Sequence, residues 1–162
     1  MLETMLDSQG LISREETFMA VAHILKQKGS TVYTVKAGDS LQSVVDSLAE
    51  HRIGAVLVID KTGTIAGIVS ERDVVRAMAG NAAAVAEKTA ADIMTVKVRT
   101  CTPADTEADL VSLMTEHRVR HLPVLSNGKL AGMISIGDVV KHRMDMMERE
   151  AEEMKSYIAS AG

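Results

Sequence analysis

Short apolar runs alternate along this chain with longer segments in which apolar residues recur every three or four positions. The apolar runs at 31–35, 55–59 and 65–70 end at turn residues and predict β-strands. The segments 40–51 and 72–79 have the spacing of amphipathic helices. Strand, helix, strand, strand and helix in this order predict an α/β (α+β) fold.

The same order of elements occurs twice. Residues 67–76, Gly-Ile-Val-Ser-Glu-Arg-Asp-Val-Val-Arg, return as residues 132–141, Gly-Met-Ile-Ser-Ile-Gly-Asp-Val-Val-Lys. The copies are 66 positions apart at His51 and His117, and 65 apart at Asp73 and Asp138 because the second hairpin turn is one residue shorter. We therefore expect two β-α-β-β-α repeats, the second beginning at residue 98. They should pack together as one module, since each alone is too small to cover both faces of its sheet.

Helices are also expected outside the repeats. Residues 15–28 can present Met19, Ala22, Ile24 and Leu25 on one face of a helix that Gly29 ends. The alanine-rich connection at 81–91 predicts a short helix.

The last helix is expected to continue to Ile158. It carries a stripe formed by Met144, Met147, Ala151, Met154 and Ile158, which indicates packing on a helix from a second subunit. The predicted division of the chain is an N-terminal segment 1–23, a first repeat 24–80, a linker 81–91, a second repeat 92–145 and a C-terminal helical extension 146–162.

Composition narrows the classes of function. The formal charge is -4, and the chain has two tyrosines, one phenylalanine and no tryptophan, which disfavours nucleic-acid binding. The single cysteine, Cys101, cannot form an internal disulfide and favours a reducing compartment. No apolar run approaches the ~20 residues that span a membrane, and no secretory signal begins the chain. We expect a cytoplasmic protein that does not bind membranes.

The repeated Ser-x-x-Asp pattern has two physical interpretations. It can form a capping box, in which the serine and the aspartate satisfy backbone N–H groups at a helix start. Alternatively, the helix N-terminus attracts an anion while the aspartate accepts hydrogen bonds from the hydroxyls of a ribose. Both interpretations remain open for Ser70 with Asp73 and for Ser135 with Asp138.

Two β-α-β-β-α units that each end in Gly-apolar-apolar-Ser-x-x-Asp, with the strand Leu122-Pro123-Val124, resemble a tandem CBS domain pair, the Bateman module named after cystathionine β-synthase. The resemblance covers residues 24–145 and extends to small bacterial proteins made of little besides one such pair. It implies two clefts between the repeats that bind AMP, ADP, ATP, NAD(H) or S-adenosylmethionine. It also implies a homodimer in which four repeats form a disc.

The resemblance further implies a set of nucleotide-binding residues. Asp73 and Asp138 would take the ribose hydroxyls, with Ser70 and Ser135 nearby. The cationic side chains of Arg72, Arg120 and His121 would hold phosphates. Position 137, the counterpart of Arg72, is glycine, so the two clefts are expected to be unequal. The Asp138 cleft would add Lys28, Ser30, Gly54, Ala55 and Val56, and the Asp73 cleft would add Met94, Val96, Arg120, His121 and Leu122.

These observations predict a non-enzymatic regulatory module that senses energy or redox state by binding AMP, ADP, ATP or NADH, and that requires no cofactor and no metal. The alternative is a ligand-free dimerisation module whose Ser-x-x-Asp motifs only cap helices. A hydrolase is disfavoured because neither Ser70 nor Ser135 has a histidine base nearby in the sequence, and Cys101 has no assigned partner. His51 and His117 occupy equivalent helix ends, which favours a structural role.

Overall fold

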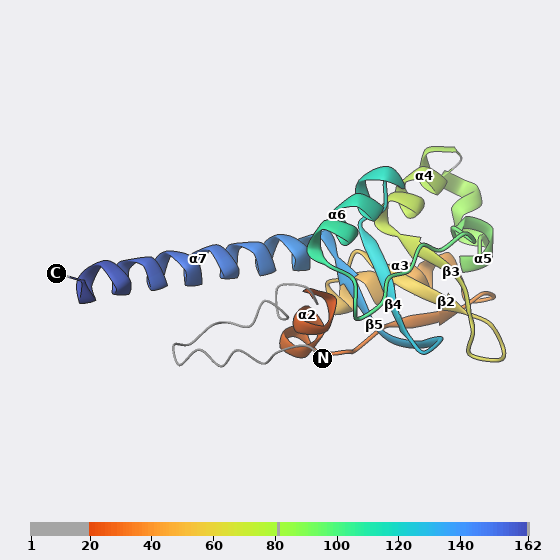
Figure 1. The fold of residues 1–162 in the computed structure, drawn as a ribbon. Helices are drawn as coiled ribbons and strands as arrows, with labels where there is room; N and C mark the ends of the chain where they lie inside the picture. The colour runs from red at the N-terminus through yellow and green to blue at the C-terminus, as the bar shows by residue number, and fades with distance from the viewer. Residues whose placement is uncertain (1–19, 81, 162) are drawn as a thin grey trace. The chain divides into compact units, whose positions relative to one another are not determined.

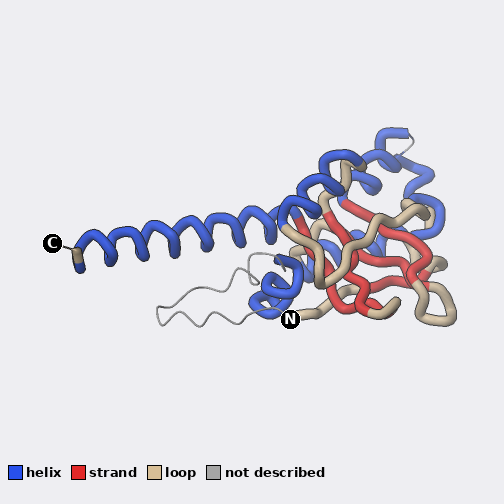
Figure 2. Tube along the Cα trace, in the orientation of Figure 1, coloured by secondary structure: helices blue, strands red, loops and turns tan. Residues whose placement is uncertain are grey.

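The computed structural model describes residues 20–80 and 82–161 (Figures 1 and 2). Contacts within the chain group it into two units. Unit 2 is Thr31–Arg99, and unit 1 combines Met1–Ser30 with Thr100–Gly162. The described helix α2 (Ala20–Lys28) therefore packs with the second repeat.

Unit 2 is built around a three-stranded sheet in the order β1-β2-β3. β1 runs parallel to β2, and β2 pairs with β3 as an antiparallel hairpin whose register shifts between Val58 and Ile59. The elements of this unit are β1 (Thr34–Lys36), α3 (Leu41–His51), β2 (Ala55–Ile59), β3 (Ile65–Ser70), α4 (Glu71–Gly80), the 3-10 helix η1 (Ala82–Glu87) and α5 (Ala90–Ile93).

Unit 1 is built around the antiparallel hairpin β4-β5. The helix α2 packs against β5 and α7, and α6 packs against α7. The elements of this unit are α2 (Ala20–Lys28), α6 (Glu107–Glu116), β4 (His121–Ser126), β5 (Lys129–Ser135) and α7 (Ile136–Ser160).

Each unit has its own apolar core. In unit 2 one face of α3, with Leu41, Val44 and Leu48, packs on Val56, Val58 and Val69 of the sheet. In unit 1, Ile24 of α2 joins Leu110 of α6 and Val139 of α7 over the inward residues of the hairpin. The remaining buried members of this second core are Val21, Cys101, Met114, Leu122, Val124 and Ile134.

The turns after α3 and α6 have the same backbone geometry, in agreement with the duplication. Arg52 and Arg118 both adopt positive φ angles, of 52° and 53°, at the ends of these helices. A left-handed residue there ends a helix by satisfying its last carbonyls, a position usually occupied by glycine. The repeated arginine is thus a structural feature of both copies.

The prediction of a β-strand at the start of the second repeat is wrong. In place of a strand, Cys101 forms a single parallel bridge with Val124. Pro103 has no N–H to donate to a neighbouring strand, and the Thr102 N–H donates to the Asp105 carboxylate at 2.7 Å, which turns the chain.

Other element boundaries moved only slightly. The first strand occupies Thr34–Lys36 instead of residues 31–35, and the segment at 81–91 contains η1 and the start of α5. The helix that contains Ile24 and Leu25 is described from Ala20 onward. The first five residues of the helix predicted over 15–28 therefore lie outside the described residues.

Candidate functional site: the two Ser-x-x-Asp motifs

The first motif joins β3 to α4 in unit 2. Ser70 is the last residue of the strand, and Asp73 lies in the first turn of the helix. Asp73 Oδ2 accepts hydrogen bonds from the Ser70 N–H at 2.8 Å and from the Ser70 hydroxyl at 2.7 Å. The carboxylate therefore holds the strand end against the helix start.

The second motif joins β5 to α7 in unit 1 and forms a complete capping box. Asp138 Oδ2 accepts hydrogen bonds from the Ser135 N–H at 2.7 Å and from its hydroxyl at 2.9 Å. In return, the Asp138 N–H donates to Ser135 Oγ at 3.2 Å. Both sides of the helix start are satisfied by these two residues.

Lys28 adds a charge to the second motif. Its ammonium Nζ lies 2.6 Å from Asp138 Oδ2 and donates to the Met133 carbonyl at 2.9 Å. Burial raises the pKa of the Asp138 carboxyl, but the hydrogen bonds from Lys28 and Ser135 and the lysine charge outweigh it, so the pKa lies below its ordinary value. Asp138 is therefore an anion at neutral pH.

In unit 2 the corresponding edge of the sheet is closed by backbone. Ile68, the counterpart of Met133, exchanges two backbone hydrogen bonds with Thr95, at 3.0 and 2.9 Å. The neighbouring Met94 packs so closely on Gly67 that a Cβ there would lie 2.6 Å from the Met94 sulfur. The glycine that begins the first motif is thus favoured by a close approach of both a side chain and the Thr95 backbone.

The capping interpretation is confirmed in full at the second motif, whereas at the first the Asp73 carboxylate makes its half of the box, and this geometry is not unique to the two motifs. The same pair of hydrogen bonds occurs at the starts of α5 and α6. There the N–H and the hydroxyl of a threonine both donate to Oδ2 of an aspartate, in the pairs Thr89–Asp92 and Thr106–Asp109. Sequence reasoning overlooked these two Thr-x-x-Asp copies, although their spacing is the same. Capping geometry alone therefore does not distinguish a ligand site from an ordinary helix start.

The structure places four of the other predicted binding residues beside the motif of their own unit: Gly54, Ala55, Arg120 and His121. Ala55 pairs with Ser70 across β2 and β3, and the Glu71 N–H donates to the Gly54 carbonyl at 3.0 Å. His121 pairs with Ser135 across β4 and β5, and the Ile136 N–H donates to the Arg120 carbonyl at 2.9 Å. The start of β2 therefore lies beside the first motif, and the start of β4 lies beside the second.

The predicted binding residues range from fully buried to exposed. Val56 and Leu122 are fully buried in their cores, so only their backbone is available to a ligand. The exposed residues among those predicted are Lys28, Ser30, Arg72, Val96 and Arg120.

The structural role predicted for His51 is supported by its ring, which stacks on the Tyr33 ring with 3.7 Å between the centroids. This contact had no signal in the sequence.

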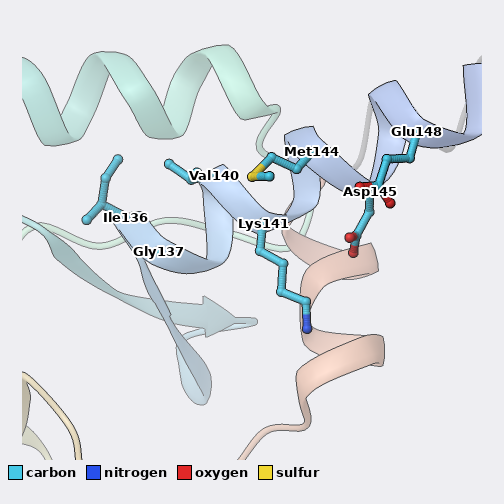
Figure 3. Close-up of a pocket in the computed structure, with 7 residues that line it drawn as sticks. All are labelled: Ile136, Gly137, Val140, Lys141, Met144, Asp145 and Glu148. Carbon is cyan, nitrogen blue, oxygen red and sulfur yellow. The ribbon is translucent and has the colours of Figure 1, made fainter. Parts of the chain in front are cut away.

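Two surface depressions of unit 1 are lined by α7, and neither includes a predicted binding residue. In the first, Ile136, Val140 and Met144 follow one another along the helix, with Lys141 and Glu148 beside them (Figure 3). The second lies between α6 and α7. These depressions belong to the helix surface rather than to the motifs.

Several other kinds of site find little support in the described ranges. Residues 20–80 and 82–161 contain no cluster of three histidine, cysteine or acidic side chains suited to a metal ion. Within the same ranges, no helix has both the length and the apolar character needed to cross a bilayer. Burial raises the pKa of the Cys101 thiol to about 12, so this side chain is a protonated core residue rather than a nucleophile.

Comparison with known proteins agrees with the duplicated fold. A model of the CBS domain family matches residues 29–80 and 90–145. The mitochondrial CBS domain-containing protein CBSX3 of Arabidopsis thaliana is 31% identical over 147 residues, which cover 85% of this chain and 71% of that protein. The structure of the CBS-domain containing protein ATU1752 from Agrobacterium tumefaciens matches with a TM-score of 0.77 and 42% identity, covering 83% of this chain and 99% of that chain.

A solved structure with a ligand is also similar. The crystal structure of CBSX2 in complex with AMP matches with a TM-score of 0.59 and 26% identity, covering 72% of this chain and 90% of that chain. The two matched segments, the repeated motif and the shared fold establish that this chain belongs to the CBS domain family and contains a tandem CBS domain pair.

Proposed function

We propose that this protein is a regulatory module that binds an adenosine-containing ligand, such as AMP, ADP, ATP or NADH, through its two Ser-x-x-Asp motifs and catalyses no reaction itself. Proteins of this family generally act as regulatory, non-catalytic modules, and the related CBSX2 was crystallised with AMP. The binding residues proposed are those predicted from the sequence, with Asp73 and Asp138 as the ribose acceptors.

The observation that carries the proposal is the way each carboxylate is held. The capping hydrogen bonds of Asp73 and Asp138, and the ion pair with Lys28, all end on Oδ2. The cap therefore needs one oxygen of each carboxylate, and Oδ1 can accept from a ribose hydroxyl while the cap stays intact. Both roles suggested by the sequence are compatible at the same residue.

Phosphate binding is assigned to the exposed cationic side chains beside the motifs. Arg72 lies in the first turn of α4 next to Asp73, where the helix dipole also favours an anion. Arg120 immediately precedes β4, one residue from the partner of Ser135. A guanidinium group binds a phosphate with two parallel hydrogen bonds, so these residues should favour nucleotides over adenosine.

Calorimetric titration with AMP, ATP and NADH tests the proposal. We expect Asp73→Asn and Asp138→Asn each to weaken binding about tenfold, a loss of about 1.4 kcal/mol, at the motif that is changed. Asp109→Asn is the matched control because it disturbs an identical cap at α6, outside the proposed sites. Equal affinities in all three variants would remove the ribose assignment, and no heat with any nucleotide would refute the ligand.

The second candidate is a ligand-free interaction module. It is favoured by the equivalent carboxylate hydrogen bonds at four helix starts of the described residues, which show that Ser/Thr-x-x-Asp also serves helices outside the proposed sites. Mass spectrometry of freshly purified, heat-denatured protein separates the two candidates. Recovery of a stoichiometric adenine nucleotide would exclude the ligand-free module.

In either case we infer a homodimer. The equivalent residues Val75 of α4 and Val140 of α7 are 64% and 52% exposed, an unusual position for two apolar side chains repeated at the same place. Sedimentation at micromolar concentration should give the mass of two chains, and a single-chain mass would contradict the inference.

A further inference from the structure

The second half of α7 extends beyond the rest of unit 1. The helix runs from Ile136 to Ser160, whereas the match to the CBS family ends at residue 145. Figures 1 and 2 show it continuing as a single helix away from β4 and β5, and every residue from 147 to 161 is exposed. An isolated helix of this length is marginally stable in water, so an amphipathic extension of this kind calls for a partner.

One stripe of apolar residues in this helix follows a heptad repeat. From Val140 onward its members are separated by four, three, four, three and four positions, the alternation that defines the a and d positions of a coiled coil, whereas Met146, Tyr157 and Ala159 lie outside the stripe. Val140, Met147 and Met154 occupy d, and they are 52%, 55% and 64% exposed. We call the full set of these a and d residues the seam: Val140, Met144, Met147, Ala151, Met154 and Ile158.

The charges that flank the seam complement a second copy of the same helix. In a parallel pair, each g residue lies near the e residue five positions later on the partner helix. Arg143 at g would then face Glu148 of the second copy, and Glu150 at g would face Lys155 of the second copy. Each contact occurs twice in a symmetric dimer, so four pairs of opposite charge flank the seam.

The antiparallel arrangement that overlaps the full seam has the reverse charge pattern. It brings each e residue near an e residue of the partner, so Lys141 meets Lys155 and Glu148 meets Glu148. Its g positions place Glu150 against Glu150. Like charges at these positions destabilise a coiled coil, which selects the parallel orientation over this antiparallel one.

A local ion pair does not prevent the interhelical contact. Lys155 pairs with Glu152 of its own helix at 2.8 Å, but both side chains are more than 70% exposed. Exposed pairs of this type contribute little, so Lys155 can exchange Glu152 for Glu150 of a second copy.

We propose that residues 140–158 of α7 form a parallel two-stranded coiled coil with the same segment of a second copy of this chain. The contact lies outside the ligand motifs and does not depend on nucleotide binding. It commits the C-terminal ends of the two chains to the same end of the dimer.

Single cysteines introduced along the helix in the full chain test this orientation. Met144→Cys and Ile158→Cys both lie at a positions, where a parallel dimer brings the two thiols together. No antiparallel register can bring both pairs together, because the two positions are 14 residues, or about 21 Å, apart along the helix. Ser156→Cys at the outward f position is the control, and the native Cys101 is buried and therefore a poor competitor.

In a glutathione redox buffer at micromolar protein, we expect both a-position variants to give at least tenfold more disulfide dimer than Ser156→Cys. Addition of Met154→Glu should abolish this excess, whereas Ser156→Glu, which adds the same charge outside the seam, should not. Both substituted side chains are exposed, so neither disturbs the core. Cross-linking of one a-position variant only would overturn the parallel orientation, and cross-linking of neither would overturn the coiled coil.

Discussion

The two Ser-x-x-Asp motifs have nearly the same sequence, yet the edges of their sheets are closed by different means. In unit 2 the backbone of Thr95 exchanges two hydrogen bonds with Ile68. In unit 1 the side chain of Lys28 donates to the Met133 carbonyl and continues to Asp138. The carbonyl at this position of the edge therefore accepts from a neutral backbone N–H in one copy and from a lysine ammonium in the other.

The two copies therefore share their fold more closely than they share a charge environment. In unit 2 the Thr95 backbone adds no charge beside the Asp73 carboxylate, which accepts a hydrogen bond from Ser70. In unit 1 Lys28 occupies the equivalent place and forms an ion pair with Asp138. Together with the difference between Arg72 and Gly137, at the position just before each aspartate, this lysine makes the two copies electrostatically unequal.

The largest expected effect concerns the close approach at the motif glycines. Gly67→Ala should lower the free energy of unfolding by about 1–3 kcal/mol because the new Cβ would meet the Met94 side chain and also lie 3.0 Å from the Thr95 carbonyl. Gly132→Ala should cost less, since its Cβ meets only the Leu25 side chain, which can rotate. Urea unfolding measures both, and a larger loss for Gly132→Ala would contradict the stated difference between the two edges.

The next effect concerns the residues that close the edges. Lys28→Met keeps the aliphatic stem but removes the donor from Met133 and Asp138, so we expect a loss of about 1 kcal/mol in unfolding free energy. Thr95→Val should change it by less than about 0.5 kcal/mol, because Thr95 bonds through its backbone. Equal losses in thermal or urea unfolding would show that Lys28 and Thr95 act alike.

Acid should weaken the second motif through Asp138. Its pKa is lower in the folded protein than its ordinary value of 3.8, so the ionised carboxylate stabilises the fold above that pH, and the contribution is lost as pH falls through the folded pKa. The stability difference between the wild type and Asp138→Asn should therefore be present at pH 6 and shrink below about pH 4. A difference that stays constant from pH 6 to pH 2 would contradict this linkage.

The smallest effect is at Gly137. A Cβ at this helical position meets only Ser135 Oγ, at an ordinary distance of 3.6 Å. Gly137→Ala should therefore stabilise the protein by up to about 0.5 kcal/mol, because it reduces the conformational freedom of the unfolded chain. The contrast with the destabilising Gly132→Ala, five residues earlier, is the check. A loss of stability at Gly137 would indicate a backbone requirement that the geometry does not explain.

Much of the fold was predictable because it rests on local periodicity. The helical spacing at 40–51 coincides with α3 (Leu41–His51), and the apolar run at 55–59 coincides with β2 (Ala55–Ile59). The first strand of the second repeat was mispredicted because apolar character near Cys101 did not reveal the turn that Asp105 makes with Thr102. A side-chain hydrogen bond of this kind is decided by rotamers that a periodic pattern does not encode.

The candidate site was predictable in its residues but not in its connections. The motif spacing identified Ser135 and Asp138, and the family resemblance named Lys28 as a neighbour, which the structure places 2.6 Å from the carboxylate. The pairing of Lys28 with the Met133 carbonyl and the replacement of a lysine by the Thr95 backbone had no signal in the pattern. Both connect segments that are far apart in the chain.

The sequence alone shows the duplication, because the motif recurs with the same residues 65 positions later. It also shows the strand and helix periods, the Ser-x-x-Asp spacing and the heptad spacing of α7, because each depends on residues only a few positions apart. The structure was needed to show that α2 packs with the second repeat, that Lys28 reaches Asp138, and that Met94 and Leu25 cover the two motif glycines. These contacts join residues remote in sequence, and their geometry follows from how the cores fill space rather than from any local preference.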